Sequence, residues 1–247
     1  METAKTSCLY VNEDALAWRT TLDAYNDVLK LKANKEKSKA KKDRDLVALD
    51  KWYHDELPKN LSSREKTYLN LEELCQLMKW KLTRGKFRPR LTDLVKANDE
   101  TTVEDTSRKA FECLPDVSSA IRELSKLKAV GPATASAILS AGAPDIVPFM
   151  ADEAMMAIPD LGEIDYRLPF YMKYVEKINQ VLQLLKKKDP EGEWTAHKVE
   201  LALWTEVIAR KYNFNLSPHV SSCENGVHSA KRKAEEAPKA KKRARKK

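Results

Sequence analysis

The sequence is poor in the residues that build β-sheets, metal sites and membrane spans. Its 247 residues include only 6 glycines, and no segment alternates apolar and polar residues for long enough to predict a strand. The four cysteines, Cys8, Cys75, Cys113 and Cys223, form no Cys-x-x-Cys pair, which argues against a zinc ribbon or an iron–sulfur loop. No apolar run approaches the roughly 20 residues of a membrane span, and no apolar signal core is present. We therefore expect no membrane contact, and free thiols in a reducing compartment.

Net charge is also missing from most of the chain. The formal charge is +8, but residues 230–247 contain ten Lys or Arg and two Glu, so residues 1–229 are balanced. A neutral domain binds DNA only through a local basic patch. The basic tail resembles a nuclear-import signal and predicts a nuclear protein, and the same bases suit non-specific binding to nucleic acid. The predicted signal consists of Lys231, Arg232, Lys233, Lys241, Lys242, Arg243, Arg245, Lys246 and Lys247.

Helical periodicity is what the sequence does contain. Apolar stripes predict helices over residues 11–31, 46–57, 67–83, 91–97, 100–113 and 168–186, with Pro58 ending the second. A last helix, from Thr195 as N-cap to about Tyr212, is apolar nearly all round and should be central. Residues 30–44 are rich in Lys and indicate a solvated linker or helix end, with a nucleic-acid arm as the alternative. We predict an all-α, non-bundle fold of about nine or ten helices in one domain, residues 1–216, followed by a disordered basic tail over residues 217–247.

A basic segment, Lys79 to Arg90, follows the helix at 67–83. It has six bases, no acid and the two aromatic residues Trp80 and Phe87 in twelve residues around Gly85. Lys and Arg there suit phosphate contacts, and the aromatics suit base stacking. The alternative is a basic helix end that complements its own dipole, with both aromatics in the core.

Residues 124–156 organise the rest of the chain. Asp116 should cap a short amphipathic helix that ends near Lys128, and Pro132 should begin the next helix, because its fixed φ is already helical. The N–H groups of Ala133, Thr134 and Ala135 should then point out of the helix start and form an anion site. Gly142, Pro144 and Pro148 connect this helix to another at about 151–158.

This stretch resembles the helix-hairpin-helix motif of the DNA glycosylase superfamily. The matching residues are Leu127-Lys-Ala-Val-Gly-Pro-Ala-Thr-Ala135, which depart from the family pattern at Ala129, where Gly is preferred. The family's catalytic Asp follows the hairpin's last Gly by about two dozen residues after a Val-Pro-like turn, and Asp152 stands there after Val147-Pro148. The detailed match covers residues 115–160. Over nearly its full length the chain is also similar to a group of eukaryotic proteins that share Val-Gly-Pro-Ala-Thr-Ala-Ser and Val-Pro-Phe-Met-x-Asp-Glu, a resemblance that implies no activity by itself.

The glycosylase resemblance implies a mechanism. A flipped base enters a pocket, and the Asp152 carboxylate stabilises the positive charge that develops on the sugar. The family's lyase members carry a Lys two residues after the hairpin Gly; Ala133 stands there, so no Schiff base is expected by that route. Ala129 implies a modified hairpin with weaker phosphate binding. The implied DNA-binding residues are Lys128, Val130, Gly131, Ala133, Thr134, Lys86, Arg88 and Arg90, and the candidate pocket aromatics are Trp80, Phe87, Phe149 and Tyr166.

Asp152 and the histidines also allow purely structural interpretations. Asp152 lies between a Pro-containing loop and a short helix, as an N-cap would, and a cap contributes about 1 kcal/mol to stability. The histidines, His54, His197, His219 and His228, do not cluster in sequence, so the first two are expected at the core edge or on a helix surface.

Three functions are compatible with these patterns. The first is a nuclear helix-hairpin-helix protein that contacts duplex DNA and acts as a monofunctional DNA glycosylase in base excision repair. The second is a non-catalytic DNA or chromatin-binding module on the same fold. The third is a protein-interaction scaffold without nucleic-acid contact, favoured by the neutral domain and by Ala129. In each case we expect a monomer with no metal and no small-molecule cofactor.

Overall fold

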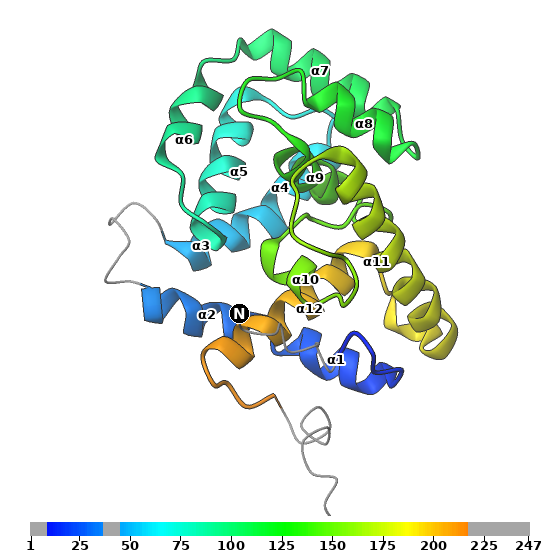
Figure 1. The fold of residues 1–247 in the computed structure, drawn as a ribbon. Coiled ribbons are helices and arrows are strands. Elements are labelled where there is room, and N and C mark those ends of the chain that lie inside the picture. The colour runs from blue at the N-terminus through cyan, green and yellow to red at the C-terminus, as the bar shows by residue number, and fades with distance from the viewer. Residues whose placement is uncertain (1–8, 37–44, 217–247) are drawn as a thin grey trace, which may run out of the picture.

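The computed structural model describes residues 9–36 and 45–216, and in these two ranges the chain is helical with no β-strand (Figure 1). The basic tail and its import signal, Cys8, Cys223, His219, His228 and most of the predicted linker at 30–44 lie outside the described residues. The helices are α1 (Ala15–Asp23), α2 (Tyr25–Glu36), α3 (Leu46–Lys51), the π-helical η2 (Trp52–Glu56), α4 (Leu57–Ser62), α5 (Leu71–Arg84), α6 (Pro89–Lys96), α7 (Glu100–Glu112), α8 (Val117–Leu124), α9 (Pro132–Gly142), α10 (Asp152–Met156), α11 (Leu168–Lys188), the 3-10 turn η3 (Pro190–Gly192) and α12 (Ala196–Lys211).

Short polar side chains define where several helices begin. The carboxylate of Asp116 accepts the N–H of Ser119 at 3.0 Å, and the hydroxyl of Thr195 accepts the N–H of Lys198 at 3.0 Å, so both predicted N-caps are confirmed. Asn70 forms a capping box with Glu73 at the start of α5. Such caps satisfy N–H groups that have no partner within the helix.

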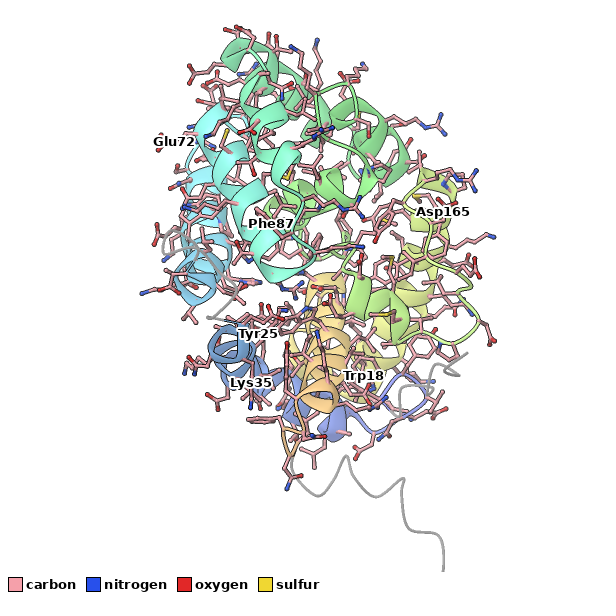
Figure 2. The ribbon with its side chains drawn as sticks, turned by 60° about the vertical axis from the view of Figure 1, so that its left-hand side comes forward. Trp18, Tyr25, Lys35, Glu72, Phe87 and Asp165 are labelled. Carbon is pink, nitrogen blue, oxygen red and sulfur yellow. The ribbon has the colours of Figure 1, made fainter. Side chains whose placement is uncertain are left out.

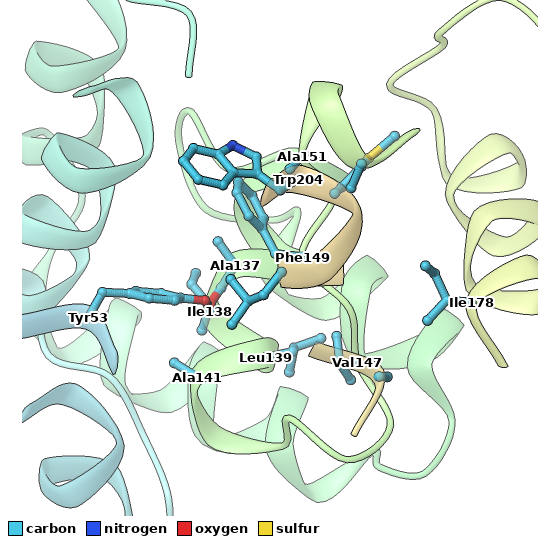
Figure 3. Close-up of a cluster of buried hydrophobic side chains, with 14 of the residues drawn as sticks. Tyr53, Ala137, Ile138, Leu139, Ala141, Val147, Phe149, Ala151, Ile178 and Trp204 are labelled. Carbon is cyan, nitrogen blue, oxygen red and sulfur yellow. The ribbon is translucent and has the colours of Figure 1, made fainter. Parts of the chain in front are cut away.

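Two central helices organise the core. α12 packs against α1, α2, α10 and α11, and it is buried on nearly every side, as its apolar surface predicts (Figure 1). α9 packs against α4, α5, α8 and α11, and its small residues let these helices approach closely. The hydroxyl of Tyr53 donates to the carbonyl of Ala137 at 2.8 Å within this cluster (Figure 3). The two central helices thereby join the N-terminal and C-terminal halves of the chain.

Three predicted helix boundaries were wrong. The single helix predicted over 11–31 is in fact two helices that meet at Ala24. The break was not predicted because one apolar stripe continues across it. Pro58 does not end the second helix: in η2 the Leu57 N–H bonds to the Trp52 carbonyl, and Pro58, which has no N–H, then enters the first turn of α4. The first hairpin helix ends at Leu124, since the next bonds are i→i+3 turns. The break at Ala24 and the π-helical segment η2 each divide a stretch that was predicted as one helix. The described residues therefore contain twelve α-helices, more than the nine or ten expected.

None of the described helices is both long enough and apolar enough to cross a membrane. Cys75 and Cys113 are partly buried free thiols.

Candidate functional site

One pocket brings together residues of the basic segment, the hairpin and the Asp152 turn. It has a volume of about 260 Å³ and lies between the α5–α6 connection, the hairpin before α9, and the start of α10. Its walls come from segments 81–91, 129–134 and 149–153, with Tyr166 closing one side. Of the predicted residues, the pocket gathers Lys86, Arg88, Gly131, Ala133, Thr134 and Asp152, together with the candidate aromatics Phe149 and Tyr166.

The hairpin turn takes the shape that glycine would favour. Ala129 has a φ of 63°, which lies in the left-handed region that L side chains rarely adopt. Ala129 therefore adopts a conformation that Gly would accept more readily, at the position where the resembling motif prefers Gly. Gly131 follows in extended backbone, with φ −105° and ψ −175°, and an added methyl group there would meet no atom within 4 Å.

The start of α9 offers a different set of N–H groups from the one expected. The N–H groups of Thr134 and Ala135 both donate to the carbonyl of Gly131 at 2.9 Å, so they are satisfied within the first turn. The prediction that they point outward unpaired was wrong. The N–H groups of Gly131 and Ala133 donate to no described residue. Together with the positive end of the α9 dipole, these two groups suit an anion at the pocket.

A buried asparagine holds the hairpin in place. The amide group of Asn98, just after α6, donates to the carbonyls of Val95 and Lys128 and accepts the N–H of Lys128 at 2.7 Å. The ammonium of Lys128 donates to the carbonyl of Ala97 at 2.9 Å, so this predicted DNA contact already has a partner at the end of α6. Nothing local in the sequence marks this role of Asn98, because its hairpin partner Lys128 lies 30 residues away.

Asp152 is not an N-cap. It is the first residue of α10, whose N-cap position is occupied by Ala151, and no side chain caps this helix. Both carboxylate oxygens of Asp152 instead accept the hydroxyl of Tyr166, each at 2.9 Å. The N-cap interpretation of Asp152 is therefore wrong, and Asp152 lines the pocket.

The backbone before Asp152 is held by buried hydroxyl groups. Ser136 accepts the N–H of Met150 at 3.0 Å, and Tyr171 and Tyr174 donate to the carbonyls of Pro148 and Phe149. These bonds tie the segment to α9 and α11. Hydrogen bonds to the protein core thus fix the backbone that leads into Asp152.

The electrostatics of the pocket are unusual at two groups. Burial and the hydrogen bond to Asp152 raise the pKa of Tyr166 to about 12, so its hydroxyl stays protonated and remains a donor at neutral pH. Burial lowers the pKa of Lys81 to about 8, with Asp152 opposing the shift and Arg88 adding to it. A lysine with so low a pKa is a signal that the sequence pattern did not single out.

The basic segment divides into a buried part and an exposed part. Trp80 is fully buried, which confirms the core alternative for this residue, whereas Phe87 is 47 % exposed on the segment between α5 and α6 and lies outside the pocket wall (Figure 2). Arg84 is buried and pairs with Glu200 at 3.2 Å. Lys86, Arg88 and Arg90 are exposed, and the first two line the pocket.

The remaining predicted contacts are spread over other surroundings. Val130 and Thr134 are both buried, while Arg90 lies on α6 and does not line the pocket. The guanidinium of Arg88 lies 5.8 Å from the centre of the Tyr166 ring, which links the exposed bases to the Asp152 side of the pocket. Only part of the predicted binding set therefore faces one site.

Two histidines meet, although their sequence positions did not indicate it. The Nε2 atoms of His54 and His197 lie 3.2 Å apart, and the rings are stacked. His54 also contacts Asp50 on α3, and His197 contacts Glu200 on α12. The two histidines are 143 positions apart in the sequence, and only the packing of the two halves of the fold brings them together.

Among the described residues, no group of three or more His, Cys, Asp or Glu is placed to hold a metal ion. Comparison of the chain with protein-family models, with curated proteins and with solved structures finds no match.

Proposed function

We propose that this protein contacts duplex DNA in the nucleus and hydrolyses the N-glycosidic bond of a base held in its pocket, as a monofunctional DNA glycosylase. One observation carries the proposal: the start of α9, two exposed bases of the basic segment and the Asp152 carboxylate line the same pocket. These features come from three distant parts of the sequence. Each suits a different task, namely phosphate binding, DNA attraction and charge stabilisation.

Phosphate binding is supported by the hairpin. The N–H groups of Gly131 and Ala133 have no acceptor among the described residues, and the dipole of the 11-residue helix α9 adds partial positive charge there. Lys86 and Arg88 line the same pocket and supply the local basic patch that a neutral domain needs. A DNA backbone that passes over the hairpin would be held by these groups without sequence preference.

The chemistry is supported by the environment of Asp152. Cleavage of an N-glycosidic bond builds positive charge on the sugar, and an ionised carboxylate at the pocket stabilises that charge and activates the attacking water. The hydroxyl of Tyr166 donates to both carboxylate oxygens and orients them. Tyr166 is therefore proposed as a positioning residue and Asp152 as the catalytic one.

Base release from duplexes that contain damaged or mismatched bases tests this proposal. The full chain should release a base, and Asp152→Asn should abolish release while the protein stays folded, because the side chain caps no helix. Asp145→Asn is the matched control: it changes an exposed carboxylate in the preceding connection, outside the pocket wall. Release at the wild-type rate by Asp152→Asn would reject this assignment.

DNA binding is tested separately with Gly131→Ala. The new methyl group meets no protein atom within 4 Å, so the fold should be unaffected, but the group would occupy space that a phosphate needs. Binding by the wild type without base release would favour the non-catalytic DNA-binding module. Absence of binding to any duplex at low salt would leave the interaction scaffold as the better description.

A further inference from the structure

The pair of His54 and His197 plays no part in the proposed hydrolysis. His54 lies on η2 and His197 on α12, so their contact connects the N-terminal half of the chain to the central C-terminal helix. Their Nε2 atoms lie 3.2 Å apart, whereas the ring centres lie 5.3 Å apart. The two nitrogens therefore point toward each other, as in a hydrogen bond between the rings.

The other ring nitrogen of each histidine faces oxygen acceptors. The Nδ1 atom of His54 lies 3.0 Å from the backbone carbonyl oxygen of Asp50 and 3.2 Å from its carboxylate. The Nδ1 atom of His197 lies 3.1 Å from the Oε2 atom of Glu200, and neither of these two buried atoms has a hydrogen-bond partner elsewhere among the described residues. Because carbonyl and carboxylate oxygens only accept, both Nδ1 atoms carry a proton.

These contacts determine how many protons the pair holds. With both Nδ1 atoms protonated, the contact between the Nε2 atoms needs one further proton. Without it two lone pairs face each other, and with two such protons two N–H groups collide. The rings together therefore hold three protons and carry one positive charge. Burial lowers the pKa of His197, with His54 and Arg84 adding to the shift and Glu200 opposing it, so His197 is the neutral ring.

The buried charges around the pair balance only in this state. The side chains of Asp50, Arg84 and Glu200 are all buried, and Arg84 pairs with Glu200 at 3.2 Å. Two carboxylates, one guanidinium and one charge on the histidine pair sum to zero. A neutral pair would leave one buried negative charge in excess, and a doubly charged pair would leave one buried positive charge in excess. A buried charge without a counter-charge is strongly destabilising.

The remaining titratable groups that surround the pair do not disturb this balance. Tyr25 on α2 donates to the Asp50 carboxylate at 2.9 Å, Tyr53 packs edge-on against both histidine rings, and Tyr174 approaches from α11. Burial raises the pKa of each phenol, so none of them ionises near neutral pH. The ionised side chains next along α3, η2 and α12 and at the start of α10 are exposed or partly exposed, and salt screens them: Lys51, Asp55, Glu56, Glu153 and Lys198.

We infer that His54 and His197 form a pH-sensitive clasp, which holds α12 to η2 while the rings share one proton between their Nε2 atoms and opens when that proton is lost or a second one binds. The side chain of His54 is 22 % exposed, so protons reach the pair from solvent. The clasp also reaches the pocket, because the Oε1 atom of Glu200 accepts Arg84, which lines the pocket. Opening of the clasp therefore alters the pocket wall. The inference does not depend on DNA binding or base release.

A clasp of this kind gives a maximum of stability rather than a slope. Below about pH 6.5 each unfolded histidine binds a proton, while the folded pair resists a second charge, so stability falls as the pH falls. Above about pH 6.5 the unfolded histidines lose their protons, while the folded pair keeps one, so stability falls as the pH rises. One proton of difference changes the folding constant up to about tenfold per pH unit on either side. Burial of two neutral histidines would give only the acidic side.

Urea unfolding of the full chain between about pH 5 and pH 9 tests the clasp, because this range includes both sides of the histidine titration. The folding constant of the wild type is divided by that of the double variant His54→Gln/His197→Gln at the same pH, which cancels the titration of all other groups. We expect this ratio to peak near neutral pH and to fall on both sides. Asp145→Asn is the matched control: its exposed carboxylate lies outside the cluster, so its ratio should show the same peak.

Nitrogen-15 NMR of the imidazole rings gives a second measurement, on the wild type alone. Both rings of the pair pack against Tyr53, so through-space contacts to that ring assign them. Near neutral pH we expect a protonated Nδ1 atom on both rings and the spectrum of an imidazolium on one of them. If the double variant does not fold, this charge state decides by itself.

The possible outcomes separate the clasp from simple burial. A ratio that falls on both sides of neutral pH, together with one charged ring, supports the clasp. A ratio that falls only toward acid, or two neutral rings near neutral pH, overturns it. Neither result changes the proposed function, which base release and DNA binding test separately.

Discussion

Replacement of Ala129 by Gly should make the protein more stable. Ala129 has a φ of 63°, and the contact between its Cβ and the backbone in this left-handed conformation costs about 1–2 kcal/mol. Glycine avoids this contact, but its more flexible unfolded chain offsets about 0.4–1 kcal/mol of the gain. The net increase in the free energy of unfolding should be about 0.5–1 kcal/mol.

Thermal and urea unfolding measure this increase. For a domain of this size, 1 kcal/mol corresponds to a rise in Tm of about 2–4 °C. Gly131→Ala is the matched control two residues away, since its backbone is extended and the new methyl group meets nothing within 4 Å; its free energy of unfolding should change by less than about 0.5 kcal/mol.

A Tm that falls or stays constant in Ala129→Gly would refute the reasoning, because it would mean that no strain is stored at this turn. DNA affinity gives an independent readout. The wild-type turn already has the conformation that Gly favours, so we expect Ala129→Gly to bind duplex DNA as tightly as the wild type. A large gain in affinity would show that the Ala129 methyl group itself hinders the phosphate.

Three further predictions concern other parts of the chain. Glu200→Gln should lower the free energy of unfolding by about 3 kcal/mol or more, because it leaves the buried Arg84 charge unpaired; a loss below about 1 kcal/mol in urea unfolding would contradict this. Burial lowers the pKa of His197, with His54 and Arg84 adding to the shift and Glu200 opposing it. The unfolded chain therefore binds more protons below pH about 6.5, and stability should fall there by up to about 1.4 kcal/mol per pH unit; urea unfolding between pH 7.5 and 5 should show a flatter profile in His197→Gln. Deletion of residues 230–247 should abolish nuclear accumulation of a fluorescent fusion and reduce the salt dependence of DNA binding; an unchanged salt slope would limit the tail to import.

Local sequence determined many of the helices. α11 and α12 lie where the apolar stripes predicted them, and Asp116, Thr195 and Pro132 begin helices as expected. These features depend on neighbours three or four residues away, so the sequence contains all the information they require. The break at Ala24 was missed because both helices share one apolar stripe.

The candidate site was only partly accessible to the same reasoning. A sequence pattern indicated the hairpin, Asp152, Lys86 and Arg88, but it did not show that Asp152 bonds Tyr166 rather than capping α10. It also gave equal weight to the aromatics of the basic segment, of which Trp80 is buried and Phe87 exposed. Each of these choices depends on which neighbours surround the side chain.

The sequence by itself determined the all-α class of the described residues, the turn before α9, and the contrast between a neutral domain and a basic tail. Only the tertiary structure decided that Lys81 joins Asp152 at one pocket, that Asn98 clamps the hairpin, and that His54 meets His197. The physical reason is range. Helix propensity, caps and turns act within a few residues, whereas burial, pKa shifts and side-chain pairing depend on segments that only the packed core brings together.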